Sequence, residues 1–261
     1  MNYFFTIIGT ECQKIIKSKL FYISAISVLL LPPVCGLFTL IPMHPDLAHQ
    51  SGLITQKAKV ISAADWPSYL RLIAQMIAVG GIILFGFIVS WTFGREYSDG
   101  TAKDLLALPL SRSLVIGAKF IAVALWTAFL ALVAFLTATV IGLLIQVPAF
   151  DIHSYLGSAG VYAVCSLMVI SLSLPIAFFA CFGKGYLPPL GFLVLALFLG
   201  NIIATMGHGA YFPWSIPAIY SGAAGAETLP VASYTIIFLI GLIGLIGLMA
   251  TFVWWRYADQ K

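Results

Sequence analysis

The sequence predicts an all-α integral membrane protein that forms a single transmembrane domain over residues 1–261. Of these residues 61% are hydrophobic and 8% are charged, whereas about a quarter of a soluble domain is charged. A helix needs about 20 apolar residues to cross a hydrocarbon core, and hydrocarbon leaves backbone groups no partner outside the helix. Six runs meet this length, at 20–41, 72–93, 120–146, 157–182, 186–206 and 231–255.

The distribution of lysine and arginine gives the orientation. With the N-terminus in the cytoplasm, ten of the 13 basic residues fall on the inner side, and only Lys57, Lys59 and Arg71 fall outside. This bias follows the positive-inside rule and predicts that both termini are cytoplasmic in a multi-pass plasma-membrane protein. The net charge of +4 then reflects topology, so it indicates no nucleic-acid partner.

Residues 2–19 show helical amphipathicity before the first span. At 100° per residue Lys14 and Lys17 lie on a polar face. A helix of this kind lies at the surface of the lipid bilayer with its lysines among the headgroups. The alternative is an extension of the first span that carries a basic anchor. The opposite, apolar face consists of Phe4, Phe5, Ile8, Cys12, Ile15 and Ile16.

Three features predict breaks and close packing in the spans. Pro32-Pro33 and Pro175 remove backbone hydrogen bonds, so each site should kink or break its helix. Gly241, Gly244 and Gly247 recur every three residues, which favours close helix contact within the chain or between chains.

Residues 207–230 form a predicted outer connection with broken helix. It is rich in aromatic residues, yet its prolines prevent one continuous helix. We expect short segments that dip into the outer interface, and an ordinary aromatic belt is the alternative. The residues that carry this interpretation are Tyr211, Phe212, Pro213, Trp214 and Pro217.

Several classes of protein are disfavoured by what the sequence lacks. No ionisable residue lies in the middle of a span, which argues against ion-coupled carriers and intramembrane metalloproteases. The sequence holds no P-loop, so an energy source has to come from a partner. The histidines fall in outer connections with poor ligand spacing, so we expect no metal or cofactor on this chain. They are His44, His49, His153 and His208.

The connection at 94–119 is predicted to be cytoplasmic and concentrates the charge of the chain. The stretch 93–119 carries four of the 13 basic and three of the 9 acidic residues. Asp99-Gly100 is a turn signal, and Thr101 with Asp104 forms a capping-box pattern. A short helix should run to Leu108 and end at Pro109. Such a helix suits the transmission of force from a soluble partner, although a merely solvated loop fits as well.

Motifs in this connection resemble those of ATP-binding-cassette (ABC) permeases of the second type. The later stretch 185–189, together with the aromatic residues at 211–214 and Pro217, is similar to the bacitracin and lantibiotic export branch. The motif in the connection consists of Glu96, Gly100, Thr101, Leu105, Leu106, Pro109 and Arg112, in this order after the second span.

The resemblance implies a bacterial exporter in which two six-span subunits, identical or related, each meet an ABC ATPase subunit that binds ATP and Mg²⁺. The helix Thr101–Leu108 would be the coupling helix, and Glu96 and Arg112 would position the connection or contact the ATPase. The cargo would be an antimicrobial peptide or a similar amphipathic compound. Alternatives are another cargo, such as a drug, a lipid-linked precursor or sodium, or a peptide-binding immunity or sensor protein that transports nothing.

Overall fold

The computed structural model describes residues 2–43, 65–101, 111–223 and 233–257, and these residues contain helices and no strand. The first four helices are α1 (Asn2–Ile16), α2 (Lys19–Met43), α5 (Trp66–Ser98) and α7 (Arg112–Leu144). They are followed by α8 (Ile152–Ser173), α9 (Pro175–Phe182), α10 (Leu187–Thr205), the 3-10 turn η1 (Gly209–Tyr211), α11 (Ile216–Ser221) and α12 (Ser233–Tyr257).

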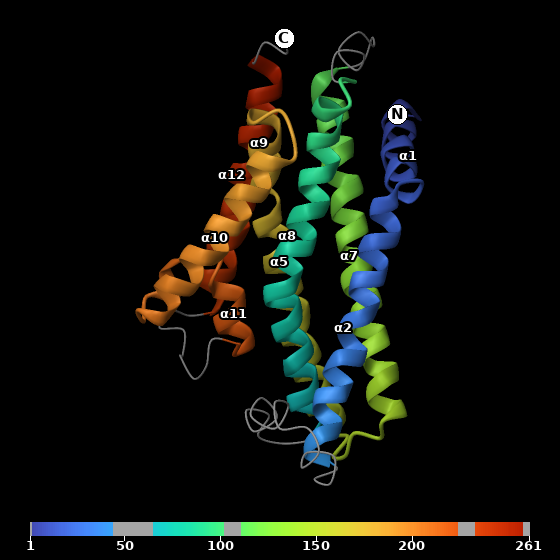
Figure 1. Cartoon of the computed structure of the whole chain (residues 1–261), viewed down its shortest axis with the longest axis vertical. Helices are drawn as coiled ribbons and strands as arrows, with labels where there is room; N and C mark the ends of the chain where they lie inside the picture. The colour runs from blue at the N-terminus through green and yellow to red at the C-terminus, as the bar shows by residue number, and fades with distance from the viewer. Residues whose placement is uncertain (1, 44–64, 102–110, 224–232, 258–261) are drawn as a thin grey trace.

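The six predicted spans are confirmed as helices long and apolar enough to cross a membrane. They are Lys19–Leu40, Trp66–Ser98, Arg112–Leu144, Ile152–Phe182, Leu187–Thr205 and Phe238–Tyr257. The helix α5 is central, because it packs against α2, α7, α8, α9, α10 and α11. The start of α1 and the last turn of α12 lie at one end of the bundle (Figure 1). We call this end the α1 end.

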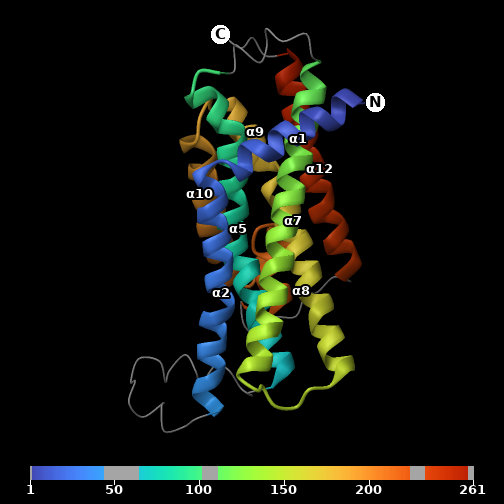
Figure 2. The ribbon, with the colours of Figure 1, turned by 90° about the vertical axis from the view of Figure 1, so that its right-hand side faces the viewer.

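The helix α1 is separate from the first span. It ends at Ile16, and α2 begins at Lys19 after a turn in which the Ser18 hydroxyl donates to the carbonyl of Ile15. Figure 2 shows α1 crossing α7 near the α1 end, at a steep angle to α2. A simple extension of the first span, the alternative left open by the sequence, therefore does not describe this segment.

The central connection is shorter than predicted. The sequence indicated 94–119, with helix resuming at Ser111 and Arg112. The helix α7 does begin at Arg112, but α5 continues to Ser98, so that the two helices leave 99–111 between them. Each of these helices has 33 residues and is about 50 Å long, against a hydrocarbon thickness of about 30 Å. The turns of α5 and α7 beyond their apolar runs contain Glu96 and Lys119. These side chains form an ion pair inside the protein, which stabilises the helical extensions.

The proline predictions had different outcomes. The helix α2 runs without interruption through Pro32-Pro33, so of the predicted kink or break the break does not occur. Membrane helices tolerate proline where neighbouring groups and small adjustments satisfy the backbone. The fourth span does break at Pro175, where α8 ends at Ser173 and α9 begins.

The glycine pattern of α12 packs within the chain. A Cβ atom at Gly247 would lie 2.4 Å from Cα of Pro175, and one at Gly244 would lie 2.9 Å from the carbonyl oxygen of Ser171. A Cβ atom at Gly241 would meet nothing within 4 Å. Two of the three glycines therefore let α12 approach the break between α8 and α9.

The predicted broken segment after the fifth span is confirmed over its described part, 207–223. The turn η1 and the short helix α11 replace a continuous helix, and the Ser215 hydroxyl donates to the carbonyls of Gly209 and Phe212. Trp214 packs against Phe192 of α10, with ring centroids 5.4 Å apart. Residues 224–230 of the predicted segment lie outside the described residues.

A methyl group at Gly247 should destabilise the protein, because it would overlap backbone atoms of Pro175 that cannot move aside. We expect Gly247→Ala to lower the thermal unfolding midpoint of the purified protein in detergent. Gly241→Ala is the matched control, since its methyl group meets open space and alanine favours helix. Equal midpoints for the two variants would contradict the packing described here.

Candidate functional site

Three charged side chains from three helices meet at the α1 end. The ammonium group of Lys119, on α7, lies 2.8 Å from Oε2 of Glu11, on α1, and 2.5 Å from Oε1 of Glu96, on α5. The three side chains are at most 6% exposed. We call Glu11, Glu96, Lys119 and the adjoining Lys14 the charge cluster. It joins α1, α5 and α7 at the base of the 99–111 connection.

Lys14 balances the charge of the cluster. Its ammonium group lies 2.5 Å from Oε1 of Glu11 and 3.6 Å from Oε1 of Glu96, and its side chain is 43% exposed. The cluster thus holds two cations and two carboxylates. Neither oxygen of Glu96 has a hydrogen-bond partner of good geometry among the described residues, so its close contact with Lys119 is an ion pair without an aligned hydrogen bond. Each buried charge depends on the others, because a buried charge without a partner is costly.

The structure shows which side of α1 packs against the bundle. Glu11 and Ile15, one helical turn apart, are buried against the bundle, whereas Phe5 and Ile16 are 67% and 51% exposed. The predicted apolar face is therefore divided between protein and surroundings. The reason is Glu11: its pairing with Lys119 turns the stripe that contains Glu11 toward α7.

Two positions of charged residues also differ from the prediction. Lys119 and Glu96 were both placed in the cytoplasmic connection 94–119, with Lys119 on a helix that leads into the third span. That helix is confirmed as the start of α7, but Glu96 is also helical, in α5, and both side chains are buried. Glu11 was not singled out at all. A signal was available, since Glu11 is the first acidic residue of the chain and the next is Asp46. A lone acid among the lysines of an amphipathic helix indicates a specific basic partner.

The pKa of the Glu11 carboxyl reflects this environment. Burial by itself raises the pKa, but the nearby ammonium groups of Lys119 and Lys14 attract and hydrogen-bond the carboxylate, and together they hold the pKa below its ordinary value of 4.5. Glu11 therefore stays ionised in the folded protein at neutral pH, as its role in the cluster requires.

The N-terminal end of the connection is anchored to α5. We call the two ends of the connection, where it joins α5 and α7, its roots. Arg95 Nε donates to Oδ2 of Asp99 at 3.0 Å, and Gly100 adopts the left-handed backbone with φ of 71°. The Thr101 hydroxyl donates back to the carbonyl of Glu96 at 3.4 Å. Thus the residue that carries the buried carboxylate also anchors the start of the connection. The rest of the predicted coupling helix, including Asp104, Leu105, Leu106 and Pro109, lies outside the described residues.

The second root, where the connection joins α7, is hydrogen-bonded to the last span. Arg112, the first residue of α7, donates from Nη1 to the carbonyl of Trp255 in α12 at 3.4 Å. The indole of Trp255 donates in turn to Sγ of Cys181 in α9 at 3.1 Å. A close approach of Gly94 to Gly185, where an added Cβ atom would lie 2.8 Å from the carbonyl oxygen, brings α5 to the same region. The two ends of the connection are therefore anchored on α5 and α7, and α7 is linked through α12 to α9.

Comparison with known proteins decides the family. Residues 7–200 match the family described as "ABC-2 family transporter protein". The chain belongs to the ABC-2 transporter family. It is also 28% identical, over 155 residues, to the bacitracin transport permease protein BCRB of Bacillus licheniformis; the matched region covers 59% of this chain and 74% of that protein. The chain is therefore a multi-pass ABC-2 permease, a membrane component of a family that works in general with an ABC ATPase.

The permease has a cavity of about 290 Å³ between α5, α10 and α11. Asn201, Trp214 and Ser215 contribute to its lining, and the buried indole N–H of Trp214 has no partner in the described parts of the chain. Polar residues elsewhere in the spans are engaged locally. Among the hydroxyls that donate to carbonyls of their own helices are those of Thr127, Thr137, Thr139, Ser166 and Ser173.

The cluster predicts a large loss of stability when its buried cation is removed. Lys119→Met leaves Glu11 and Glu96 with only the half-exposed Lys14, so we expect a loss of about 3–5 kcal/mol and a lower thermal midpoint. Arg71→Met is the control, since Arg71 is exposed and forms no ion pair with a described residue. Adding Glu11→Gln and Glu96→Gln to Lys119→Met should restore much of the loss. A variant Lys119→Met as stable as Arg71→Met would rule out the cluster.

The low pKa of Glu11 predicts a pH-dependent contribution to stability. The folded-state pKa lies below 4.5, so the contribution is complete above that pH and is lost as the pH falls through the folded value. Thermal midpoints of the wild type and Glu11→Gln, measured from pH 7 to pH 3, should differ at pH 7 and converge below about pH 4.5. A difference that stays constant over this range would show that ionised Glu11 does not stabilise the fold.

Proposed function

We propose that this permease is the membrane subunit of an ABC exporter that moves an antimicrobial peptide, or a similar amphipathic compound, out of a bacterial cell. Family membership carries the proposal, and the similarity to a bacitracin transport permease supports the cargo class. The absence of a P-loop in the sequence agrees with ATP and Mg²⁺ bound by a partner ATPase. A second permease subunit, identical or related, would complete the membrane part.

The distribution of charge supports a cytoplasmic location for the α1 end. Nine of the 13 basic residues are described. Arg71 is in the second turn of α5, at the opposite end of that helix from Glu96, whereas the other eight are in α1 or the turn after it, the first turn of α2, the last turns of α5 and α12, the first turns of α7 and the turn after α9. Figure 1 shows these segments at the α1 end. In a bacterial plasma membrane this bias favours cytoplasmic termini and a cytoplasmic 99–111 connection. In this orientation α1 lies where an interfacial helix would meet the inner headgroups, and the connection can reach a soluble ATPase.

Coupling would work through the roots of the connection. In the proposal, residues 101–108 form a coupling helix on the ATPase, and its movement pulls on α5 and α7. Lys119 pairs α7 with Glu96 of α5 and with Glu11 of α1, so these three helices respond together. Arg112 passes the same displacement to α12 through the carbonyl of Trp255. A small movement at the connection is thus transmitted to four helices.

The export route would lie along apolar surface with few polar contacts. The cavity between α5, α10 and α11 fits such a route, because Asn201 and the unpartnered indole of Trp214 offer hydrogen bonds in otherwise apolar surroundings. An amphipathic peptide needs few fixed polar contacts of this kind. No ionisable side chain lies at the middle of a span, so coupling to a driving ion is disfavoured.

Loss of the leucine contact should dissociate the proposed complex. In the proposal, Leu105 and Leu106 of the coupling helix enter an apolar groove on the ATPase. We expect Leu105→Asp with Leu106→Asp to abolish co-purification with the ABC ATPase encoded beside this gene, because burying a charged side chain in such a groove is costly. Ser111→Asp with Ser113→Asp is the matched control, since it adds the same two charges at exposed positions nearby. Dissociation by both pairs would indicate general repulsion rather than a leucine contact.

Transport itself is tested in the same strains by peptide resistance. Resistance should disappear with a hydrolysis-inactive ATPase and with the leucine double variant, while the serine double variant should keep it. Resistance that survives an inactive ATPase in an intact complex would mean that the protein acts by binding peptide rather than by pumping it. A permease that never associates with an ABC ATPase would overturn the exporter proposal.

A further inference from the structure

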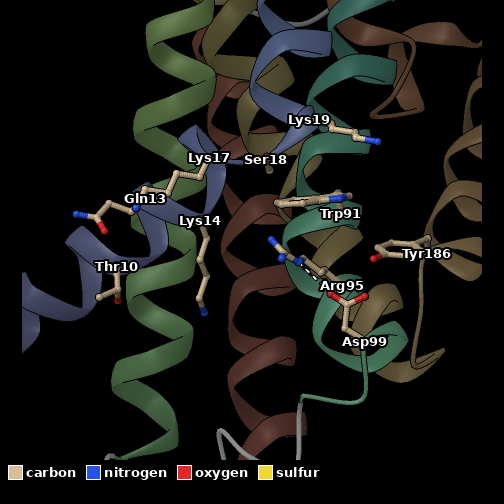
Figure 3. A pocket seen from close by; sticks show the side chains of 10 residues that line it. All are labelled: Thr10, Gln13, Lys14, Lys17, Ser18, Lys19, Trp91, Arg95, Asp99 and Tyr186. Carbon is tan, nitrogen blue, oxygen red and sulfur yellow. Dashed lines mark hydrogen bonds and ion pairs between the residues drawn. The ribbon is translucent and has the colours of Figure 1, made fainter.

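A basic pocket of about 590 Å³ opens beside the charge cluster, between α1, the start of α2 and the end of α5. Figure 3 shows side chains of α1 on one side of the pocket, Trp91 and Arg95 of α5 on another, and Tyr186 opposite. The complete lining is Thr10, Gln13, Lys14, Lys17, Ser18, Lys19, Trp91, Arg95, Asp99 and Tyr186. Four of these residues are cationic and one is acidic.

Two of these four cations have no ion-pair partner among the described residues. Lys14 is paired with Glu11 at 2.5 Å, and Arg95 is paired with Asp99 at 3.0 Å. Arg95 also lies over the ring of Trp91, 4.9 Å from its centroid. Lys17 and Lys19 are exposed and have no ion-pair partner in the described ranges. The pocket therefore has an excess of two positive charges, enough for one or two phosphodiester groups.

The surroundings of the pocket select a lipid rather than a free anion. Lys19 is the first residue of the first span, and Ile23, Ile26 and Leu30 follow it at helical spacing, each more than half exposed. An acyl chain can run along this stripe while its headgroup stays among the lysines. Trp91 and Tyr186 are the aromatic residues typical of the interface between hydrocarbon and headgroups.

We propose that this pocket binds the headgroup of an anionic phospholipid, with Lys17 and Lys19 contacting its phosphate and the acyl chains lying on the exposed stripe of α2. The site is distinct from the proposed cargo route and requires no ATPase. It also gives α1 a second attachment. The inner side of the helix is held by the charge cluster, and its lysine side is held by the lipid.

Lipid binding can be measured on the delipidated full-length permease in detergent. We expect phosphatidylglycerol to bind and to raise the thermal midpoint, and phosphatidylcholine to do so much less. Each lysine near a membrane anion contributes about fivefold in affinity, so Lys17→Gln with Lys19→Gln should weaken phosphatidylglycerol binding by roughly thirtyfold. Lys17→Arg with Lys19→Arg should retain it, because the charge is kept.

The control removes two charges elsewhere. Arg71→Gln with Arg256→Gln changes exposed residues outside the pocket and should leave binding at the wild-type level. Equal binding by the lysine double variant and the wild type would overturn the proposal, as would equal loss in the arginine control. Binding of inorganic phosphate or glycerol phosphate as tight as that of phosphatidylglycerol would mean that the site takes a free anion and not a lipid. These measurements involve no transport, so their failure would leave the exporter proposal untouched.

Discussion

Lys119 lies inside the bundle, and its charge can remain there only because Glu11 and Glu96 face it from two other helices. A buried ion pair adds little net stability compared with apolar residues of the same shape, but the loss of one partner is costly. The pairing therefore acts mainly by excluding other arrangements of α1, α5 and α7.

Several features of the α1 end follow from this constraint. The helices α5 and α7 extend past their apolar runs, which shortens the connection to 99–111 and places its two roots on neighbouring, mutually paired helices. Because Glu11 turns one side of α1 inward, Lys14, Lys17 and their neighbours line the basic pocket. The start of the connection and the basic pocket share Arg95 and Asp99, so both lie beside the same group of charges.

The packing of α12 against α8 and α9 involves close backbone contact and no ion pair among the described residues. At the Pro175 break, Gly244 and Gly247 let α12 approach the backbone of α8 and α9. The Arg112 to Trp255 contact then connects α12 to the first turn of α7.

The sequence by itself determined the six spans, the break at Pro175 and the broken region after the fifth span, and it offered a separate amphipathic helix as one of two interpretations of residues 2–19. These depend on local properties, namely hydropathy, proline chemistry and the need of backbone groups for hydrogen bonds in hydrocarbon. Only the tertiary structure decided that Glu11 meets Lys119, 108 residues away, and that Gly247 meets Pro175. Ion pairs and close approaches of this kind depend on which helices are neighbours and how each is rotated. The periodicity of apolar residues around one helix specifies neither its neighbours nor its rotation. In α2 the apolar run is continuous, so the sequence also did not show that the helix continues through Pro32-Pro33.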